Sequence, residues 1–216
     1  MIRTALSMVS PGGAHGRLSI LIFHRVHAHP DPLAPGEVTT VEFDDLCRWL
    51  RRWCEVLPLQ QAVAALRERR LPSRAVAITF DDGYRDNHDQ ALPVLRAHGL
   101  HATFFVATGY LDGGRMWNDT VIEAIRHASV DAIDLTGTPA DVLGVLPLHD
   151  NAARVQAIRT IIGYAKYLPQ AERQRCVDAV ARRSQAALPD DLMMRSDELR
   201  SLQQVGMGVG AHTVTH

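Results

Sequence analysis

Short and almost continuous apolar runs recur along this 216-residue chain, and they constrain its fold more than any other feature. The runs at residues 18–23, 75–80 and 102–107 are typical of strands that are buried on both faces of a sheet. Helical periodicity lies between them, because from Thr40 onward apolar residues recur at intervals of three and four positions. Strands that alternate with helices over short connections form a mainly parallel sheet with right-handed crossovers. The sequence therefore predicts an α/β fold.

The same patterns predict the other elements of the chain. These are a weak strand at 55–59, helices at 60–70 and 86–98, a helix capped by Asn118 or Asp119, a small hairpin or irregular insertion at 131–148, helices at 151–167 and 170–187, a short helix from Ser196, and a last strand at 208–211. The sequence shows no internal repeat. We therefore expect a single domain, residues 1–216, with a mainly helical insertion at residues 131–195.

Side chains that can bind metals or move protons follow directly after the predicted strands. His24, Asp81 and His212 each come just after the last residue of such a run. The carboxyl ends of parallel strands lie at one edge of a sheet, and ligands of such folds bind there. We therefore expect these side chains to share one site.

Two pairs of residues indicate the chemistry of that site. His212 and His216 are four residues apart, so on one face of a helical turn both imidazoles can reach a single metal ion. Asp81 and Asp82 are adjacent, so one carboxylate can bind the metal while the other handles a proton. Together the two pairs suggest a metal-dependent hydrolase.

Each candidate residue also has a structural interpretation. Asp81 and Asp82 can form a simple turn after a strand, where aspartate is preferred, and the two histidines can belong to an unstructured tail. His24 can be a packing or hydrogen-bonding residue rather than a substrate contact. Trp117 and Asn118 can stack on a sugar, or they can anchor and cap a helix.

Composition narrows the setting. The chain is 46% hydrophobic and 22% charged, as in ordinary globular domains. Its formal charge of −1 gives no electrostatic reason to expect nucleic acid or an acidic membrane as partner. No stretch approaches the roughly 20 apolar residues that span a bilayer, and the run at 4–9 is too short for a signal-peptide core. We therefore expect a cytoplasmic location by default, with Cys47, Cys54 and Cys176 reduced.

Several segments resemble one known family. Thr79-Phe-Asp-Asp-Gly83 and His212-Thr-Val-Thr-His216 look like the first two motifs of the polysaccharide deacetylases, which are carbohydrate esterase family four, the nodulation-factor deacetylase homology domain. Ile22-Phe-His-Arg-Val26, Asp82-Gly-Tyr-Arg-Asp-Asn87 and Ala102-Thr-Phe-Phe-Val106 are also similar to that family. The matching segments run from about residue 18 to residue 216, apart from the insertion.

The resemblance implies a distorted, incomplete (β/α) barrel that removes N-acetyl or O-acetyl groups from a polysaccharide or oligosaccharide. It implies that Asp81 is the general base and that Asp82, His212 and His216 bind a divalent metal ion, usually zinc. A metal-activated water then attacks the acetyl carbonyl. The candidate substrate contacts are His24, Trp117 and Asn118.

The later motifs of that family, which include its general acid, lie downstream of the second histidine, where this sequence ends. We therefore expect weak activity on N-acetyl sugars and greater residual activity on activated acetyl esters. No residue is assigned as the general acid, and His24 is the other histidine at this edge of the sheet that is available as a substitute. We also expect self-association through unpaired sheet edges. The alternative functions are a truncated, non-catalytic metal-binding or sugar-binding fragment and a hydrolase of another non-peptide amide.

Overall fold

The computed structural model describes residues 2–215 and divides the chain into two compact units. The first unit comprises the residues up to Pro30, Glu37–Gly113 and the residues from Leu192 onward. The second comprises Asp31–Gly36 and Gly114–Asp191. None of the helices within residues 2–215 combines the length and the apolar character needed to cross a bilayer.

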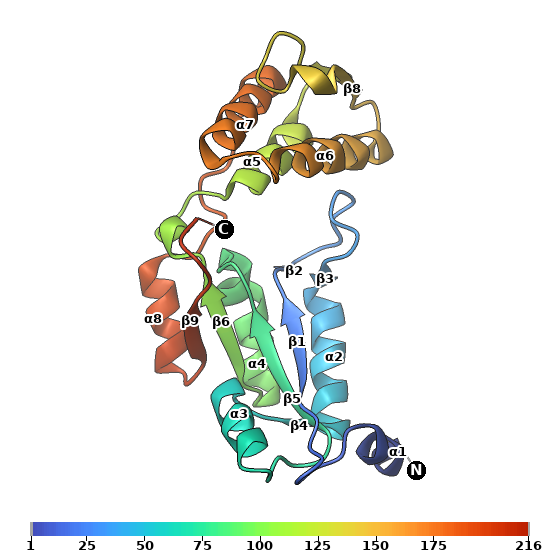
Figure 1. Cartoon of the computed structure of the whole chain (residues 1–216), viewed down its shortest axis with the longest axis vertical. Helices are drawn as coiled ribbons and strands as arrows, with labels where there is room; N and C mark the ends of the chain where they lie inside the picture. Colours follow the sequence, from blue (N-terminus) through green and yellow to red (C-terminus); the bar gives the residue numbers. More distant parts are fainter. Residues whose placement is uncertain (1, 216) are drawn as a thin grey trace. The chain divides into compact units, whose positions relative to one another are not determined.

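A five-stranded sheet forms the centre of the first unit (Figure 1). Its strands are β1 (Ser19–Phe23), β4 (Glu55–Val56), β5 (Ala75–Phe80), β6 (Ala102–Val106) and β9 (Gly208–Ala211). The strand order is β1-β5-β6-β9, β4 pairs with the start of β5, and every pairing is parallel. The mainly parallel α/β fold is therefore confirmed. Within the described residues the sheet stays open, with β1 and β9 as its edges, and self-association through them stays a prediction.

Five α-helices and one short strand pair surround this sheet in the described part of the first unit. They are α1 (Ile2–Val9), α2 (Thr40–Trp53), α3 (Leu59–Arg67), α4 (Leu92–His98), α8 (Ser196–Gln204), and the parallel pair β2 (Val26–His27) and β3 (Val38–Thr39). Thr39 caps α2, because its side chain accepts the Glu42 backbone N–H while the Glu42 carboxylate accepts the Thr39 N–H. A π-helical turn at Asn87–Ala91 leads into α4.

The core of the first unit lies between one face of the sheet and the helices α2 and α4. Phe80 of β5 stacks on Phe104 of β6 at 4.9 Å and on Phe23 of β1 at 5.3 Å between ring centroids. Phe43 of α2 meets Phe23 and Phe80 edge-on. Aromatic pairs of this kind add about 0.5–1.5 kcal/mol each beyond the burial of their area. The strand ends that carry the candidate site are therefore held in a rigid layer.

The second unit has a hydrophobic core of its own. It contains α5 (Trp117–His127), the antiparallel hairpin of β7 (Ala132–Asp134) and β8 (Val145–Pro147), α6 (Asn151–Ala165) and α7 (Gln170–Ser184). Arg126 on α5 pairs with Asp31 at 2.6 Å and so ties the segment Asp31–Gly36 to this unit. The predicted hairpin is confirmed, and most of the predicted insertion falls within this unit.

Candidate functional site

Three backbone hydrogen bonds fix the turn that follows β5. The N–H of Asp81 donates to the carbonyl of Phe23, at the end of β1, at 2.8 Å. The carbonyl of Asp82 accepts the N–H of Ala107, just after β6, at 2.9 Å, and the carbonyl of Gly83 accepts the N–H of Met194 at 2.9 Å. Because each residue of the turn is tied to a different segment, its side chains are pre-positioned before any ligand binds.

The two adjacent carboxylates lie in different environments. Asp82 is only 3% exposed, and its backbone has a φ of +75°, in the left-handed region that few non-glycine residues adopt. Asp81 is half-buried. A buried carboxylate needs a cation or several donors near it, whereas a more accessible one can exchange protons with a substrate. The structure thus separates the two aspartates in the way that a ligand and a base require.

The structure brings Asp82 and His212 together, as the sequence predicts. The N–H of His212 donates to the carbonyl of Val106 at 2.7 Å, so His212 lies directly beside the end of β6. Its Nε2 atom is 3.6 Å from Oδ1 of Asp82. The imidazole remains about one-third exposed and so is accessible from solvent.

The Asp82–His212 pair fits a divalent metal ion. Two ligands about 2.0–2.2 Å from a tetrahedral zinc ion lie about 3.3–3.6 Å from each other. The observed separation of 3.6 Å is within this range and is longer than an ordinary hydrogen bond between nitrogen and oxygen. A carboxylate and an imidazole are also common donors to zinc. The donor set and its spacing therefore agree with a metal site.

The predicted helical turn at the second motif is wrong for the part of it that the structure describes, residues 212–215. Thr213 has a φ of +60°, which a right-handed helix does not allow. The carbonyls of residues 213–215 accept hydrogen bonds from segment 108–110 at 2.9–3.2 Å, so they do not point along a helix. His216 lies outside the described residues, and its role as a ligand stays a prediction.

The loop after β6 is itself fastened to the start of α8. Both carboxylate oxygens of Asp112 accept hydrogen bonds from Ser196, one from its N–H at 2.8 Å and one from its hydroxyl at 2.9 Å. These bonds from Ser196 hold the pKa of the Asp112 carboxyl below its usual range. The segment that pairs with residues 213–215 is therefore anchored at both ends, by β6 and by α8.

His24 lies at the same edge of the sheet, just after β1. Its side chain is exposed, while its carbonyl accepts Nδ2 of the fully buried Asn87 at 2.8 Å. Next to it, Arg25 donates through Nε to Asp86 at 2.7 Å and packs over the ring of Tyr84. The turn that carries His24 is thus bonded to the residues that follow the two aspartates.

Sequence reasoning did not assign roles to Arg25, Asp86 and Asn87. A signal was present, since Asp86 and Asn87 fall within the segment that resembles the family beyond the turn. A pattern of single residues cannot show, however, that an amide after one strand bonds to a carbonyl after another. Those contacts are long-range, with 61 to 63 residues between the partners.

Trp117 and Asn118 open α5 in the second unit. Trp117 is 9% exposed, belongs to the core of that unit, and has the guanidinium of Arg173 over its ring at 4.8 Å. This packing favours the interpretation of Trp117 as the anchor of a helix. The role of both residues as substrate contacts stays a prediction.

A second group of potential metal ligands occurs in the described residues, formed by His88, Asp89 and Glu198. Nε of Arg85 lies 3.3 Å from Asp89 and 3.1 Å from Glu198. The guanidinium pairs with both carboxylates and offsets one of their two negative charges. This group is therefore a surface ion-pair network and needs no metal ion to explain it.

Gly83 provides a test of the turn. A Cβ at this position would lie 2.8 Å from Cγ1 of Val106, and its φ of +86° is unfavourable for any other residue. We expect Gly83→Ala to lower the free energy of unfolding by about 2–4 kcal/mol, from backbone strain and overpacking together. Urea denaturation of the purified variant measures this change.

Gly99→Ala is the matched control for Gly83→Ala. Gly99 also has a positive φ, +61°, but a Cβ added there would meet no atom of the described residues within 4 Å. Strain alone then costs about 1–2 kcal/mol. Equal losses of stability in the two variants would show that Val106 does not restrict the turn.

Sequence comparisons relate the chain to one family of known proteins. Residues 68–137 match the family model described as polysaccharide deacetylase. The chain is 35% identical over 163 residues to the putative polysaccharide deacetylase YxkH of Bacillus subtilis, which covers 68% of this chain and 56% of that protein. It is 30% identical over 82 residues to the poly-beta-1,6-N-acetyl-D-glucosamine N-deacetylase of Staphylococcus epidermidis, covering 38% of this chain and 28% of that protein. The chain thus spans about half the length of the first relative and less of the second.

Among solved structures, the chain is similar to the Streptococcus pyogenes deacetylase PplD in complex with acetate, with a TM-score of 0.49 and 19% sequence identity. The match covers 92% of this chain and 57% of that one. A de-N-acetylase from Aggregatibacter actinomycetemcomitans gives a TM-score of 0.47 at 17% identity, with coverage of 90% and 54%.

Proposed function

Because the chain belongs to the polysaccharide deacetylase family, we propose that it is a metal-dependent hydrolase that removes acetyl groups from a polysaccharide or oligosaccharide. The observation that supports this most is the buried Asp82 carboxylate 3.6 Å from the His212 imidazole, with the more accessible Asp81 beside it. The relative from Staphylococcus epidermidis is named for N-acetylglucosamine linked in a polymer. N-acetylglucosamine oligomers are therefore the substrates of first choice.

Asp82 and His212 would hold the metal ion, with His216 as the third ligand that the sequence predicts. When bound, such an ion activates water at neutral pH and polarises the acetyl carbonyl. The backbone of the chain holds these two ligands in position. The carbonyl of Asp82 accepts a hydrogen bond from the N–H of Ala107, and the N–H of His212 donates one to the carbonyl of Val106. Val106 directly precedes Ala107 in the chain.

Asp81 acts as the general base in this proposal. Its N–H is bonded to Phe23, so its carboxylate is held at the strand end while remaining partly accessible. It takes a proton from the attacking water, and the acetyl group leaves as acetate. A positioned base of this kind contributes about 10²–10⁴-fold in rate.

His24 is the candidate general acid. A sugar amine is a poor leaving group unless it receives a proton as the carbon–nitrogen bond breaks. The His24 backbone is held by Asn87, and its side chain is exposed at the same edge of the sheet as Asp81. An imidazole that is open to solvent can donate that proton to the leaving amine and then be reprotonated by solvent.

The role of His24 can be tested with two substrates. We expect His24→Ala to lower acetate release from N-acetylglucosamine oligomers by about 10²–10⁴-fold. Hydrolysis of an aryl acetate should fall far less, because an aryl oxide leaves without a proton. Initial rates on both substrates, with equal metal loading, measure the difference. Parallel losses on the two substrates would argue against His24 as the acid.

The substrate class is tested by offering N-acetylglucosamine oligomers, an O-acetylated oligosaccharide and small cyclic amides to the metal-loaded chain. Acetate released from either sugar supports the proposal. Turnover of the cyclic amides alone would favour a hydrolase of another amide. Saturable sugar binding with no turnover, in the presence of bound metal, would favour a binding protein.

A further inference from the structure

The edge of the first unit opposite the candidate site has a distinct surface. Strand β5 begins at Ala75 and ends next to Asp81, so the segments before the strands lie at the far end of the sheet from the site (Figure 1). We call residues 2–17, 51–56 and 66–74 the α1 face. Hydrogen bonds join its segments, because the backbone N–H of Arg74 donates to the carbonyl of Ser10 at 2.8 Å and the guanidinium of Arg3 donates to that of Arg52 at 3.1 Å.

Helix α1 exposes apolar side chains on this face. None of its residues is buried, and Ile2, Met8 and Val9 are 52%, 74% and 70% exposed. An isolated helix of eight residues is marginal in water, so α1 depends on what its apolar side chains contact. This arrangement leaves much of its apolar surface available to a partner.

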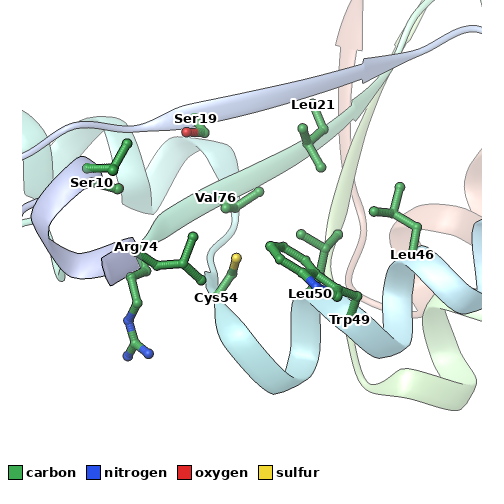
Figure 2. A pocket seen from close by; sticks show the side chains of 11 residues that line it. Ser10, Ser19, Leu21, Leu46, Trp49, Leu50, Cys54, Arg74 and Val76 are labelled. Atoms are coloured by element: carbon green, nitrogen blue, oxygen red, sulfur yellow. The ribbon is translucent and has the colours of Figure 1, made fainter. Parts of the chain in front are cut away.

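One side of α1 lines a partly open apolar pocket of about 270 Å³. Leu6 and Val9 line it from α1, and Trp49 and Leu50 line it from α2. Figure 2 shows Leu46, Trp49 and Leu50 projecting from one side of α2 toward β1 and β5. Trp49 is nevertheless 44% exposed. The contact between α1 and the rest of the unit is therefore loosely packed, and an indole lies at its margin.

Basic side chains surround α1. Six arginines of the α1 face are exposed and form no ion pair with a carboxylate of the described residues. They are Arg3, Arg17, Arg51, Arg52, Arg67 and Arg69. The acidic residues in the same segments are Glu55 and Glu68, and Glu68 is paired with Arg70. Positive charge is therefore concentrated on this face. The formal charge of the whole chain, −1, does not reveal this local excess.

We propose that the α1 face docks on the surface of an anionic lipid membrane. Exposed apolar side chains on a helix, with arginines beside them, are features of helices that bind at a membrane interface. Arginines attract anionic headgroups, and an indole is favoured at the boundary between headgroups and acyl chains. A soluble polyanion would contact the arginines but would gain nothing from the exposed side chains of Ile2 and Met8. Docking of this kind directs the opposite edge of the sheet, with Asp81 and His212, away from the lipid, and it does not rest on the proposed hydrolysis.

Cosedimentation with lipid vesicles tests this proposal. We expect the full chain to bind vesicles that contain phosphatidylglycerol, to bind pure phosphatidylcholine vesicles far less, and to be released as salt rises. Met8→Glu should weaken binding by about 10–100-fold, because it removes an apolar contact with the lipid. Replacing Arg51 and Arg52 by Gln should weaken binding by about fivefold for each arginine.

Val142→Glu is the matched control for Met8→Glu. Val142 lies in the second unit and is also 74% exposed, so this variant should bind vesicles as the wild type does. Equal binding by Met8→Glu and Val142→Glu would overturn the proposal. Loss of binding on arginine replacement alone, with Met8→Glu unaffected, would indicate a soluble polyanion as partner and would also overturn it. Because Met8 is exposed, circular dichroism should show an unchanged fold in its variant, and Ile2→Glu provides an independent second substitution.

Discussion

Asp81→Asn is expected to lower acetate release from N-acetylglucosamine oligomers by about 10²–10⁴-fold while leaving bound metal unchanged. The substitution keeps the size of the side chain but removes its ability to take a proton. The backbone bonds that place the turn do not involve this side chain, so the fold should be unaffected. Turnover and metal content, measured on the same preparation, give both quantities.

Asp82→Asn is the matched comparison for Asp81→Asn. Asparagine tolerates the left-handed backbone at this position, where φ is +75°, so the turn should persist. A neutral amide binds a divalent cation more weakly than a carboxylate does, and metal content should therefore fall. If Asp81→Asn loses the metal and Asp82→Asn retains it, the two roles are reversed.

His212→Ala is expected to weaken metal binding by more than the roughly 10–100-fold that loss of an outer-shell partner costs. Nε2 of its imidazole lies 3.6 Å from Oδ1 of Asp82, and alanine offers no nitrogen that could bind the metal in its place. The backbone N–H bond to Val106 persists in the variant, so β9 should remain paired. Competition with a chromogenic chelator measures the affinity.

His24→Ala serves as the control for His212→Ala. His24 lies at the same edge of the sheet, but it is assigned to proton donation and not to the metal. Its replacement should leave the metal affinity within a factor of about two. Equal affinities for the His212 and His24 variants, under identical metal loading, would count against His212 as a ligand.

The parts of the fold that the sequence predicts best are those set by local pattern. The strands Ala75–Phe80 and Gly208–Ala211 have the predicted bounds, because each is a short run with abrupt polar or glycine boundaries. The three cysteines are free, as expected. Helix α1 was not predicted, because residues 4–9 carry no signal that distinguishes a short surface helix from a weak apolar run.

The candidate site shows a similar limit. Parallel strands place Asp81, His24 and His212 at one edge, and this follows from topology alone. The conformation of residues 212–215 does not follow from topology, because it depends on hydrogen bonds to segment 108–110, about 105 residues away. The division into two units also depends on long-range contacts, such as that between Asp31 and Arg126.

The most direct test of the site at Asp81, Asp82 and His212 is acetate release from N-acetylglucosamine oligomers as a function of added divalent metal. The chain is first stripped with a chelator, and bound metal is measured at each step of the titration. We predict that acetate release rises in proportion to bound metal, reaches its plateau at one ion per chain, and is about 10²–10⁴-fold lower at every loading in Asp81→Asn. Equal release by the stripped and the loaded chain, or full activity of Asp81→Asn, would contradict the assignment.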